Sequence, residues 1–258
     1  MEHPRSYNIM RHGHKLELGE TRPSLENSHL TSEQQTMWDE SIEALGIKDP
    51  EITYETLLLI EQLADKIFQE LPPNAIVVFN STKTPRTQMT LDLLSRSITR
   101  LSLDSDKNIR TSCLWEPDYT AQKSNSLTNI SSSLENDGLL KIMQNINMNS
   151  ESNSLRAYLE KEGTVSHQDE DALVLEAVNA DLSRGKQSLF RQRAEILKKQ
   201  IQDLQKSTHA IDAPVYFYGV GHHGSLIAWD IAFNGRDSYS NVDEIPKPLS
   251  LISINPEP

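Results

Sequence analysis

The sequence is poor in cysteine and in long hydrophobic runs. Its 258 residues include one cysteine, so no disulfide can form within the chain. No apolar run approaches the roughly 20 residues that a membrane-spanning helix needs. The first ten residues, MEHPRSYNIM, also lack the long apolar segment of a secretory signal. These absences argue against a disulfide-rich secreted scaffold and a membrane protein, and they predict a cytoplasmic location.

Positive charge is scarce as well. The chain has 25 Lys and Arg residues against 37 Asp and Glu residues, which gives a formal net charge of -12. Nucleic acids and anionic membranes are bound by basic faces, so neither is expected as a partner. Any anion that this protein binds must be held by a few local cations, which makes the position of each arginine informative.

Short segments rich in β-branched and aromatic residues predict a β-sheet. Their ranges are 7–10, 76–79, 109–114, 215–220 and 249–254. Apolar residues spaced by three and four predict helices between them, within 60–71, 91–101 and 190–204. The alternation of strands and helices predicts one α/β domain over residues 1–258, with three layers: a mainly parallel central sheet and helices on both faces.

One part of the chain does not follow this alternation. Residues 120–154 are rich in Ser and Asn and keep no period, which predicts a polar insertion at about 120–185. Binding specificity often resides in such connecting segments. We therefore expect the choice of substrate to depend on this insertion and on the 14–30 loop.

Charged and imidazole side chains follow three of the predicted strands. They are Arg11 and His12 after the first strand, Arg86 after the second, and His222 and His223 after the fourth. Ligands of open α/β sheets bind beyond the carboxyl ends of the strands, so these side chains are expected to meet in one pocket. Guanidinium groups match phosphoryl oxygens, and a helix predicted to begin at Thr84-Pro85 adds a positive N-terminus. The pattern predicts a phosphoryl site.

Such a pocket can also react. A neutral imidazole can attack phosphorus, which makes His12 the candidate nucleophile. Arg11 and Arg86 would stabilise the charge on the transferred group. Glu116, at the end of the third predicted strand, is the candidate that gives a proton to the leaving oxygen, provided that its surroundings raise its pKa.

Three segments of the chain resemble the signature segments of the histidine phosphatase superfamily, whose fold is the phosphoglycerate-mutase-like one. They are RHG at 11–13, STKTPRTQMT at 81–90 and VGHHG at 220–224, and HLTSEQQTMW at 29–38 is similar to a further helix start of the family. The resemblance implies that His12 carries the phosphoryl group and that Arg11, Arg86 and His222 bind it. It also implies a proton donor at the position of Glu116, as in the branch of mutases and small phosphatases.

The sequence departs from the family pattern at several positions. Lys83 and Thr84 replace Pro and Leu, and His14 replaces Glu or Gln. His223 stands where the phytase-like branch would have Asp, and the Trp and Asn segment of sugar-phosphate mutases is absent. The resemblance therefore implies a divergent member of the smaller branch: a phosphatase of phosphomonoesters that needs no metal or cofactor, with a phosphorylated small molecule or phosphopeptide as substrate.

Two other interpretations stay open. His12 and His14, with His222 or His223, would offer three imidazoles to a zinc ion, although the neighbouring arginines would repel it. The chain could also bind a phosphorylated ligand without turning it over, which the unusual Lys83-Thr84-Pro85 stretch favours. The sequence does not predict an oligomeric state.

Overall fold

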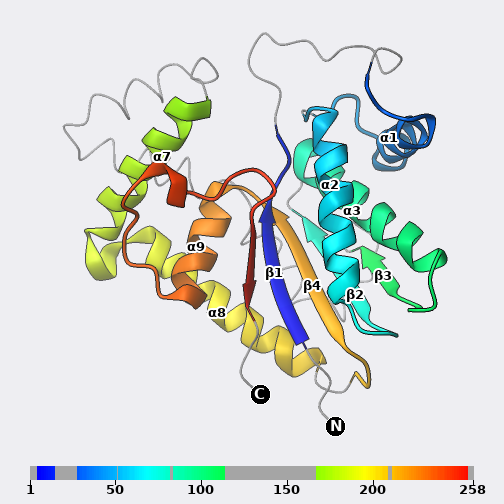
Figure 1. The fold of residues 1–258 in the computed structure, drawn as a ribbon. Helices are drawn as coiled ribbons and strands as arrows, with labels where there is room; N and C mark the ends of the chain where they lie inside the picture. The colour runs from blue at the N-terminus through cyan, green and yellow to red at the C-terminus, as the bar shows by residue number, and fades with distance from the viewer. Residues whose placement is uncertain are drawn as a thin grey trace.

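A five-stranded sheet forms the centre of the fold (Figure 1). The computed structural model describes residues 5–14, 28–50, 52–81, 84–113, 167–208 and 211–254. The strand order is β3-β2-β4-β1-β5, with β1 (Arg5–Arg11), β2 (Ile76–Ser81), β3 (Arg110–Cys113), β4 (Val215–Gly221) and β5 (Leu251–Ile254). The first four strands are parallel and β5 is antiparallel to β1. The predicted mainly parallel sheet is therefore confirmed.

Helices cover both faces of the sheet (Figure 1). One layer contains α1 (Ser32–Leu45), α2 (Glu55–Glu70) and α3 (Pro85–Leu103), and the other contains α7 (His167–Leu182), α8 (Leu189–Thr208) and α9 (His223–Asn234). Two short 3-10 helices, η2 (Gly185–Gln187) and η3 (Val242–Glu244), lie in the connections. The predicted three-layer α/β architecture is confirmed.

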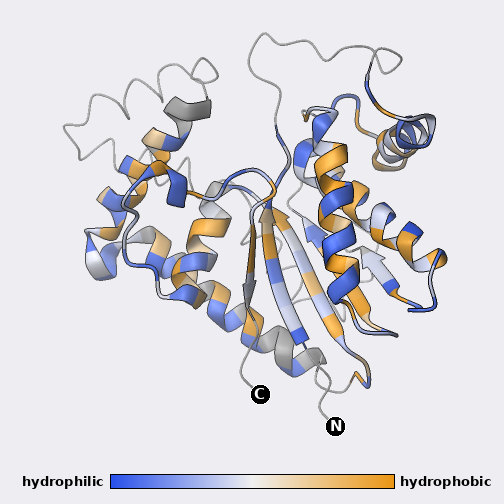
Figure 2. Ribbon diagram, in the orientation of Figure 1, coloured by the Kyte–Doolittle hydropathy of each residue, from blue (hydrophilic) through white to orange (hydrophobic). Residues whose placement is uncertain are grey.

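The alternation of side chains along the strands creates a separate core on each face of the sheet. Tyr7 and Ile9 of β1 pack in the cluster that includes residues of α7, α8 and α9, whereas Met10 packs with α1, α2 and α3. In β4, Phe217 and Tyr218 divide in the same way. Figure 2 shows the matching stripes of hydrophobic residues on the helices.

Local sequence accounts for the starts of α1 and α3 and for the end of α2. α2 ends one residue before Leu71, which is followed by Pro72 and Pro73, because proline cannot continue a helix. α3 has Thr84 at its N-cap and Pro85 at its first helical position. α1 begins with a capping box, in which Thr31 and Gln34 each accept a backbone N–H of the other.

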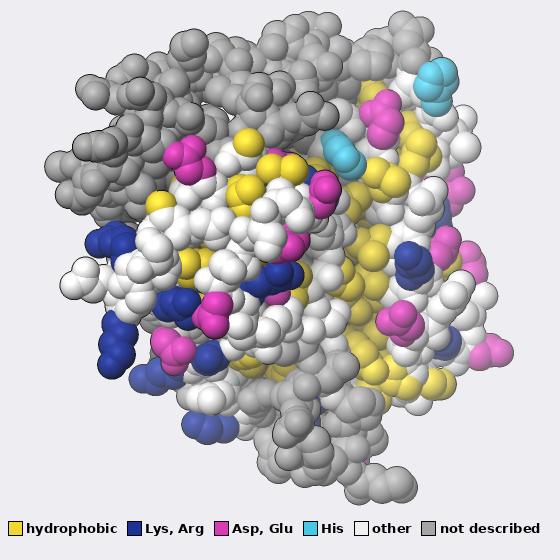
Figure 3. All heavy atoms as spheres, turned by 60° about the vertical axis from the view of Figure 1, so that its left-hand side comes forward, with side chains coloured by type: hydrophobic (Ala, Val, Ile, Leu, Met, Phe, Trp, Pro, Cys, Tyr) yellow, Lys and Arg dark blue, Asp and Glu magenta, His cyan; other side chains and the backbone are white. Residues whose placement is uncertain are grey.

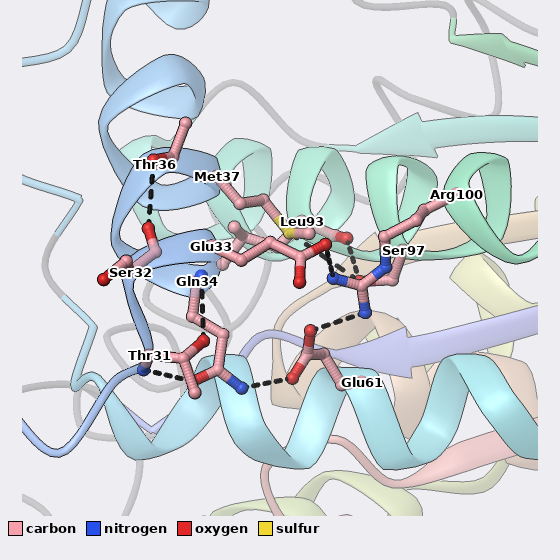
Figure 4. Close-up of polar contacts among 10 residues, drawn as sticks. All are labelled: Thr31, Ser32, Glu33, Gln34, Thr36, Met37, Glu61, Leu93, Ser97 and Arg100. Carbon is pink, nitrogen blue, oxygen red and sulfur yellow. Dashed lines mark hydrogen bonds and ion pairs between the residues drawn. The ribbon is translucent and has the colours of Figure 1, made fainter.

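Polar contacts join α1 to α2 and α3 (Figure 4). The Gln34 side-chain nitrogen donates to Glu61 of α2 at 2.6 Å, and Arg100 of α3 donates to the same carboxylate at 2.8 Å. Arg100 also donates to Glu33 at 3.0 Å. These contacts fix α1 to α2 and to α3, the helix that carries Arg86.

The last part of the segment predicted as a polar insertion packs into the core. Residues 167–182 form α7, and four of its apolar side chains are buried with α8 and α9: Val174, Ala177, Val178 and Leu182. This stretch is thus a component of one helical layer, and its buried face is apolar rather than polar.

Charged side chains of opposite sign are mixed on the face that Figure 3 shows. Ion pairs on the side of α7, α8 and α9 join Arg191 to Asp237 and Arg236 to Glu244, both at 2.8 Å. Over the described ranges, every helix falls short of the length and hydropathy needed to cross a bilayer.

Candidate active site

The carboxyl ends of β2, β4 and β1 lie side by side. β4 occupies the middle of this trio, and its register pairs Gly221 with Arg11 of β1 and Val220 with Ser81 of β2. Each strand therefore releases its following segment at the same edge of the sheet. The three motif segments, which are far apart in the sequence, meet there as predicted.

Arg11 ends β1 with its side chain on the α7 side of the sheet. Only 3% of this residue is exposed. Its Nη1 donates to the carbonyl oxygen of Pro246 at 3.0 Å and lies 3.7 Å from a carboxylate oxygen of Asp171 in α7. The other oxygen of Asp171 pairs with Lys247 at 2.7 Å. Arg11 is thus held between α7 and the segment that leads into β5.

His12 lies directly beyond β1, where alternation turns its side chain away from that of Arg11. It is 4% exposed, and its backbone N–H donates to the Gly221 carbonyl at 3.1 Å. Its Nδ1 lies 2.7 Å from the carbonyl oxygen of Gly13. Because a carbonyl only accepts, Nδ1 must carry the hydrogen, and in the neutral ring Nε2 then has a free lone pair. That is the form of histidine a nucleophile requires.

Gly13 allows the end of β1 to press against two helices. Its N–H donates to the Thr90 hydroxyl of α3 at 3.0 Å, and that hydroxyl donates to the Arg86 carbonyl at 2.7 Å. A Cβ atom at Gly13 would collide with the side chain of Thr56 in the first turn of α2. Glycine is therefore required here for close approach, and the contact fixes the carbonyl that orients His12.

Arg86 and His222 stand on the other two strand ends. Arg86 is the second residue of α3 and is partly buried. His222 is the N-cap of α9 and is 2% exposed. Its ring meets the ring of His12 edge-on, with centroids 5.0 Å apart and an interplanar angle of 64°. His12 and His222 are thus in contact, and Arg86 and Arg11 lie close enough for their charges to act on His12.

The surroundings of His12 favour its neutral form. Its pKa lies well below the usual 6.5, first because burial disfavours the charged imidazolium. The positive charges of His222, Arg86 and Arg11 lower the pKa further, and the hydrogen bond to Gly13 opposes them only in part. A neutral imidazole beside two guanidinium groups is poised to meet an anion as a nucleophile.

This lowered pKa makes the stability of the protein depend on pH. Between the unfolded pKa of 6.5 and the lower folded pKa of His12, only the unfolded chain binds the proton, so the free energy of unfolding falls as pH falls through this window. We expect urea unfolding at about pH 7.5 and about pH 5.5 to show a smaller loss of stability in His12→Asn than in the wild type.

The exposed His29 provides the matched control, and His29→Asn should follow the wild type. If His12→Asn and the wild type lost the same free energy of unfolding between these two pH values, a lowered pKa at His12 would be contradicted.

Other residues that the sequence singled out are described only in part or not at all. Glu116 and Lys83 lie outside the described residues, so the proton-donor role of Glu116 stays a prediction. His223 is the first residue of α9, and nothing is described of its side chain. His14 is half-buried, and its carbonyl accepts from Thr53 at 2.9 Å.

Sequence reasoning missed Asp171 and Lys247. Asp171 pairs with Arg11, and Lys247 pairs with Asp171. Asp171 lies within the segment predicted as an insertion, and no local sequence pattern connects Asp171 with Arg11. For the part of the chain that the structure describes, no group of three or more His, Cys, Asp or Glu side chains is arranged to hold a metal ion.

Comparisons with known proteins give matches among solved structures. No protein-family model and no curated protein matches this sequence. A phosphoglycerate mutase from Bacillus anthracis str. Sterne is 11% identical with a TM-score of 0.43, and the match covers 98% of this chain and 88% of that one. A mycobacterial glucosyl-3-phosphoglycerate phosphatase is 16% identical with a TM-score of 0.32, covering 96% and 89%. A Hafnia alvei phytase in complex with myo-inositol hexakis sulphate is 10% identical with a TM-score of 0.35, covering 98% and 80%.

At these identities and TM-scores, the description of the site depends on this chain's own strand order and side chains.

Proposed function

We propose that this protein is a metal-independent phosphatase that hydrolyses a phosphomonoester through a phosphohistidine on His12. The observation that carries the proposal is the state of His12: a buried imidazole with hydrogen on Nδ1, a lowered pKa, and the guanidinium groups of Arg11 and Arg86 and the ring of His222 nearby. A phosphoryl group needs both a nucleophile and compensation for its negative charge, and this cluster offers both.

In the first step, Nε2 of His12 attacks phosphorus. A P–N bond forms while the P–O bond to the leaving group breaks, and the leaving oxygen takes a proton. The proposed donor is Glu116, at the position that the sequence predicts beyond β3. In the second step, water attacks the phosphohistidine, the P–N bond breaks, and the proton released by water returns to the carboxylate. The products are inorganic phosphate and the free enzyme.

The cations act on the charge of the transferred group. In phosphoryl transfer most catalysis comes from positioning the group and from compensating charge on its equatorial oxygens. Arg86 has its backbone at the N-terminus of α3, so its guanidinium and the helix dipole act in the same direction. Arg11 is fixed by Pro246 and Asp171, so its position requires little reorganisation when a phosphoryl group arrives.

A non-catalytic binder of phosphorylated ligands is the second candidate. The contacts of Arg11 with Pro246 and Asp171 favour this candidate. An arginine that pairs with a carboxylate can have a structural role without taking part in catalysis. A metal-dependent hydrolase that uses His12 and His14 with His222 or His223 as ligands is the third. Each candidate gives a different result in the same assay.

We expect the purified protein to hydrolyse a generic aryl phosphate equally fast with and without excess EDTA. Loss of turnover in EDTA, restored by zinc, would support the metal-dependent hydrolase instead. Binding of inorganic phosphate by calorimetry without any turnover would support the non-catalytic binder. A panel of phosphorylated metabolites and phosphopeptides, assayed by phosphate release, then identifies the substrate class.

A further inference from the structure

Two threonines of α3 form a chain of contacts that ends on His222. The Thr84 hydroxyl lies 3.3 Å from Nε2 of His222 and 2.9 Å from the Thr87 hydroxyl. The Thr87 hydroxyl in turn donates to the backbone carbonyl of Thr84 at 2.9 Å. We call these three residues, Thr84, Thr87 and His222, the hydroxyl chain.

The direction of these hydrogen bonds follows from the number of hydrogens available. Each hydroxyl has a single hydrogen, and a backbone carbonyl only accepts. The Thr87 hydrogen goes to the Thr84 carbonyl, so the hydrogen between the two hydroxyls must come from Thr84. The Thr84 oxygen then accepts, and the hydrogen of the third contact must come from Nε2 of His222. All three contacts are satisfied only in this direction.

The Thr84 hydroxyl is available for this contact because it does not cap its helix. Thr84 is the N-cap of α3, yet its side chain makes no capping hydrogen bond, and its carbonyl accepts from the N–H groups of Thr87 and Gln88. An N-cap threonine ordinarily turns its oxygen to the backbone of the first turn. Here the oxygen is turned to an imidazole on another strand end.

We propose that Thr84 and Thr87 are positioning residues that keep hydrogen on Nε2 of His222 and thereby make His12 the nucleophile of the pair. The two rings lie side by side, and either imidazole could in principle attack phosphorus. The Gly13 carbonyl keeps the hydrogen of His12 on Nδ1, so its Nε2 has a lone pair. The hydroxyl chain instead keeps a hydrogen on Nε2 of His222. His222 then serves as a hydrogen-bond donor. This division of roles deepens the proposed function and depends on it for its catalytic meaning.

The protonation of the two rings can be measured without any turnover. Long-range proton–nitrogen NMR spectra of the protein labelled with 15N-histidine distinguish the two ring nitrogens of each histidine. In the wild type at mildly alkaline pH, we expect hydrogen on Nδ1 of His12 and on Nε2 of His222. Thr84→Val, which keeps the shape and removes the hydroxyl, should abolish the preference for Nε2 at His222. Thr84→Ser should restore it.

Thr87→Ala is a second variant, which should turn the Thr84 hydroxyl from an acceptor into a donor toward His222. Without the Thr87 oxygen, the Thr84 hydroxyl loses its acceptor and can donate to His222. We expect hydrogen to move to Nδ1 of His222 in this variant. The matched control is Thr99→Val, which removes a hydroxyl of the same helix that contacts Ser95 and Thr111 far along the chain from Thr84. Its histidine spectra should equal those of the wild type.

Kinetics add a separate readout. We expect Thr84→Val to lower kcat for an aryl phosphate about 10-fold, with recovery in Thr84→Ser, as for other residues that orient an active-site histidine. Hydrogen on Nδ1 of His222 in an active wild type would overturn this inference and leave the phosphatase proposal standing. Hydrogen on Nε2 in a wild type without turnover would support the hydroxyl chain and contradict the phosphatase.

Discussion

Replacement of His12 by alanine should lower kcat for aryl phosphate hydrolysis by about 10⁴-fold or more, because it removes the proposed nucleophile, whose Nε2 keeps its lone pair while Nδ1 donates to Gly13. In the tautomer that we propose, Nε2 of His222 donates to Thr84, so that nitrogen offers no lone pair to phosphorus. His12→Asn should be equally inactive, because asparagine keeps the polarity of the site but offers no nucleophilic nitrogen. Steady-state assays of both variants measure the effect.

The control for this prediction is His29→Ala, which removes an imidazole from an exposed position before α1. It should retain wild-type kcat. Circular dichroism of His12→Ala should match the wild type, because truncating His12 leaves both core clusters intact. A folded His12→Ala variant with wild-type turnover would rule out His12 as the nucleophile.

Arg86→Ala should give the second largest loss, about 10²-fold to 10³-fold in kcat/KM. The guanidinium would compensate charge that builds up on the phosphoryl oxygens in the transition state, so kcat should fall more than KM rises. The side chain is only partly buried at the first turn of α3, so its loss should leave the fold intact. Steady-state kinetics with an aryl phosphate separate the two parameters.

Arg96→Ala provides a matched control on the same helix. Arg96 pairs with Asp92 at 2.7 Å and with Glu40 at 2.9 Å, and it lies ten residues beyond Arg86 along α3. Its kinetics should equal those of the wild type. An Arg86→Ala variant that changes KM alone would indicate that Arg86 binds the ground state and the transition state equally.

Much of the fold was predictable because its strands are short and strongly apolar. The buried runs at 76–79 and 215–220 alternate with amphipathic helices, and their order along the chain was sufficient to predict a mainly parallel sheet. The convergence of Arg11, Arg86 and His222 followed from the same rule, since parallel strands end at one edge.

Two helices of the second layer were not predicted by their periodicity. In α9, the sequence HGSLIAWDIAFN is apolar nearly all round because the helix is buried, and such a run gives no helical stripe. In α7, the apolar run at 173–175 obscures the stripe that Val174, Ala177 and Val178 form in the core. Both cases depend on burial, which local sequence does not encode.

The fine geometry of the site also lay beyond sequence reasoning. The pairing of Arg11 with Asp171 joins residues 160 positions apart, so no spacing rule points to it. The state of His12 depends on how closely Gly13 approaches Thr56 and on where its carbonyl then points. The sequence marked Thr84 as a helix start and as a departure from the family pattern, and its contact with His222 gives that departure a physical role.

The most direct test of the account is to locate the phosphoryl group during turnover. The protein is mixed with a labelled phosphomonoester, quenched in alkali within one turnover so that the P–N bond survives, digested and mapped by mass spectrometry. The account predicts the label on His12 of the wild type and no label on His12→Ala. Label on any other residue, or rapid phosphate release with no labelled protein, would contradict it.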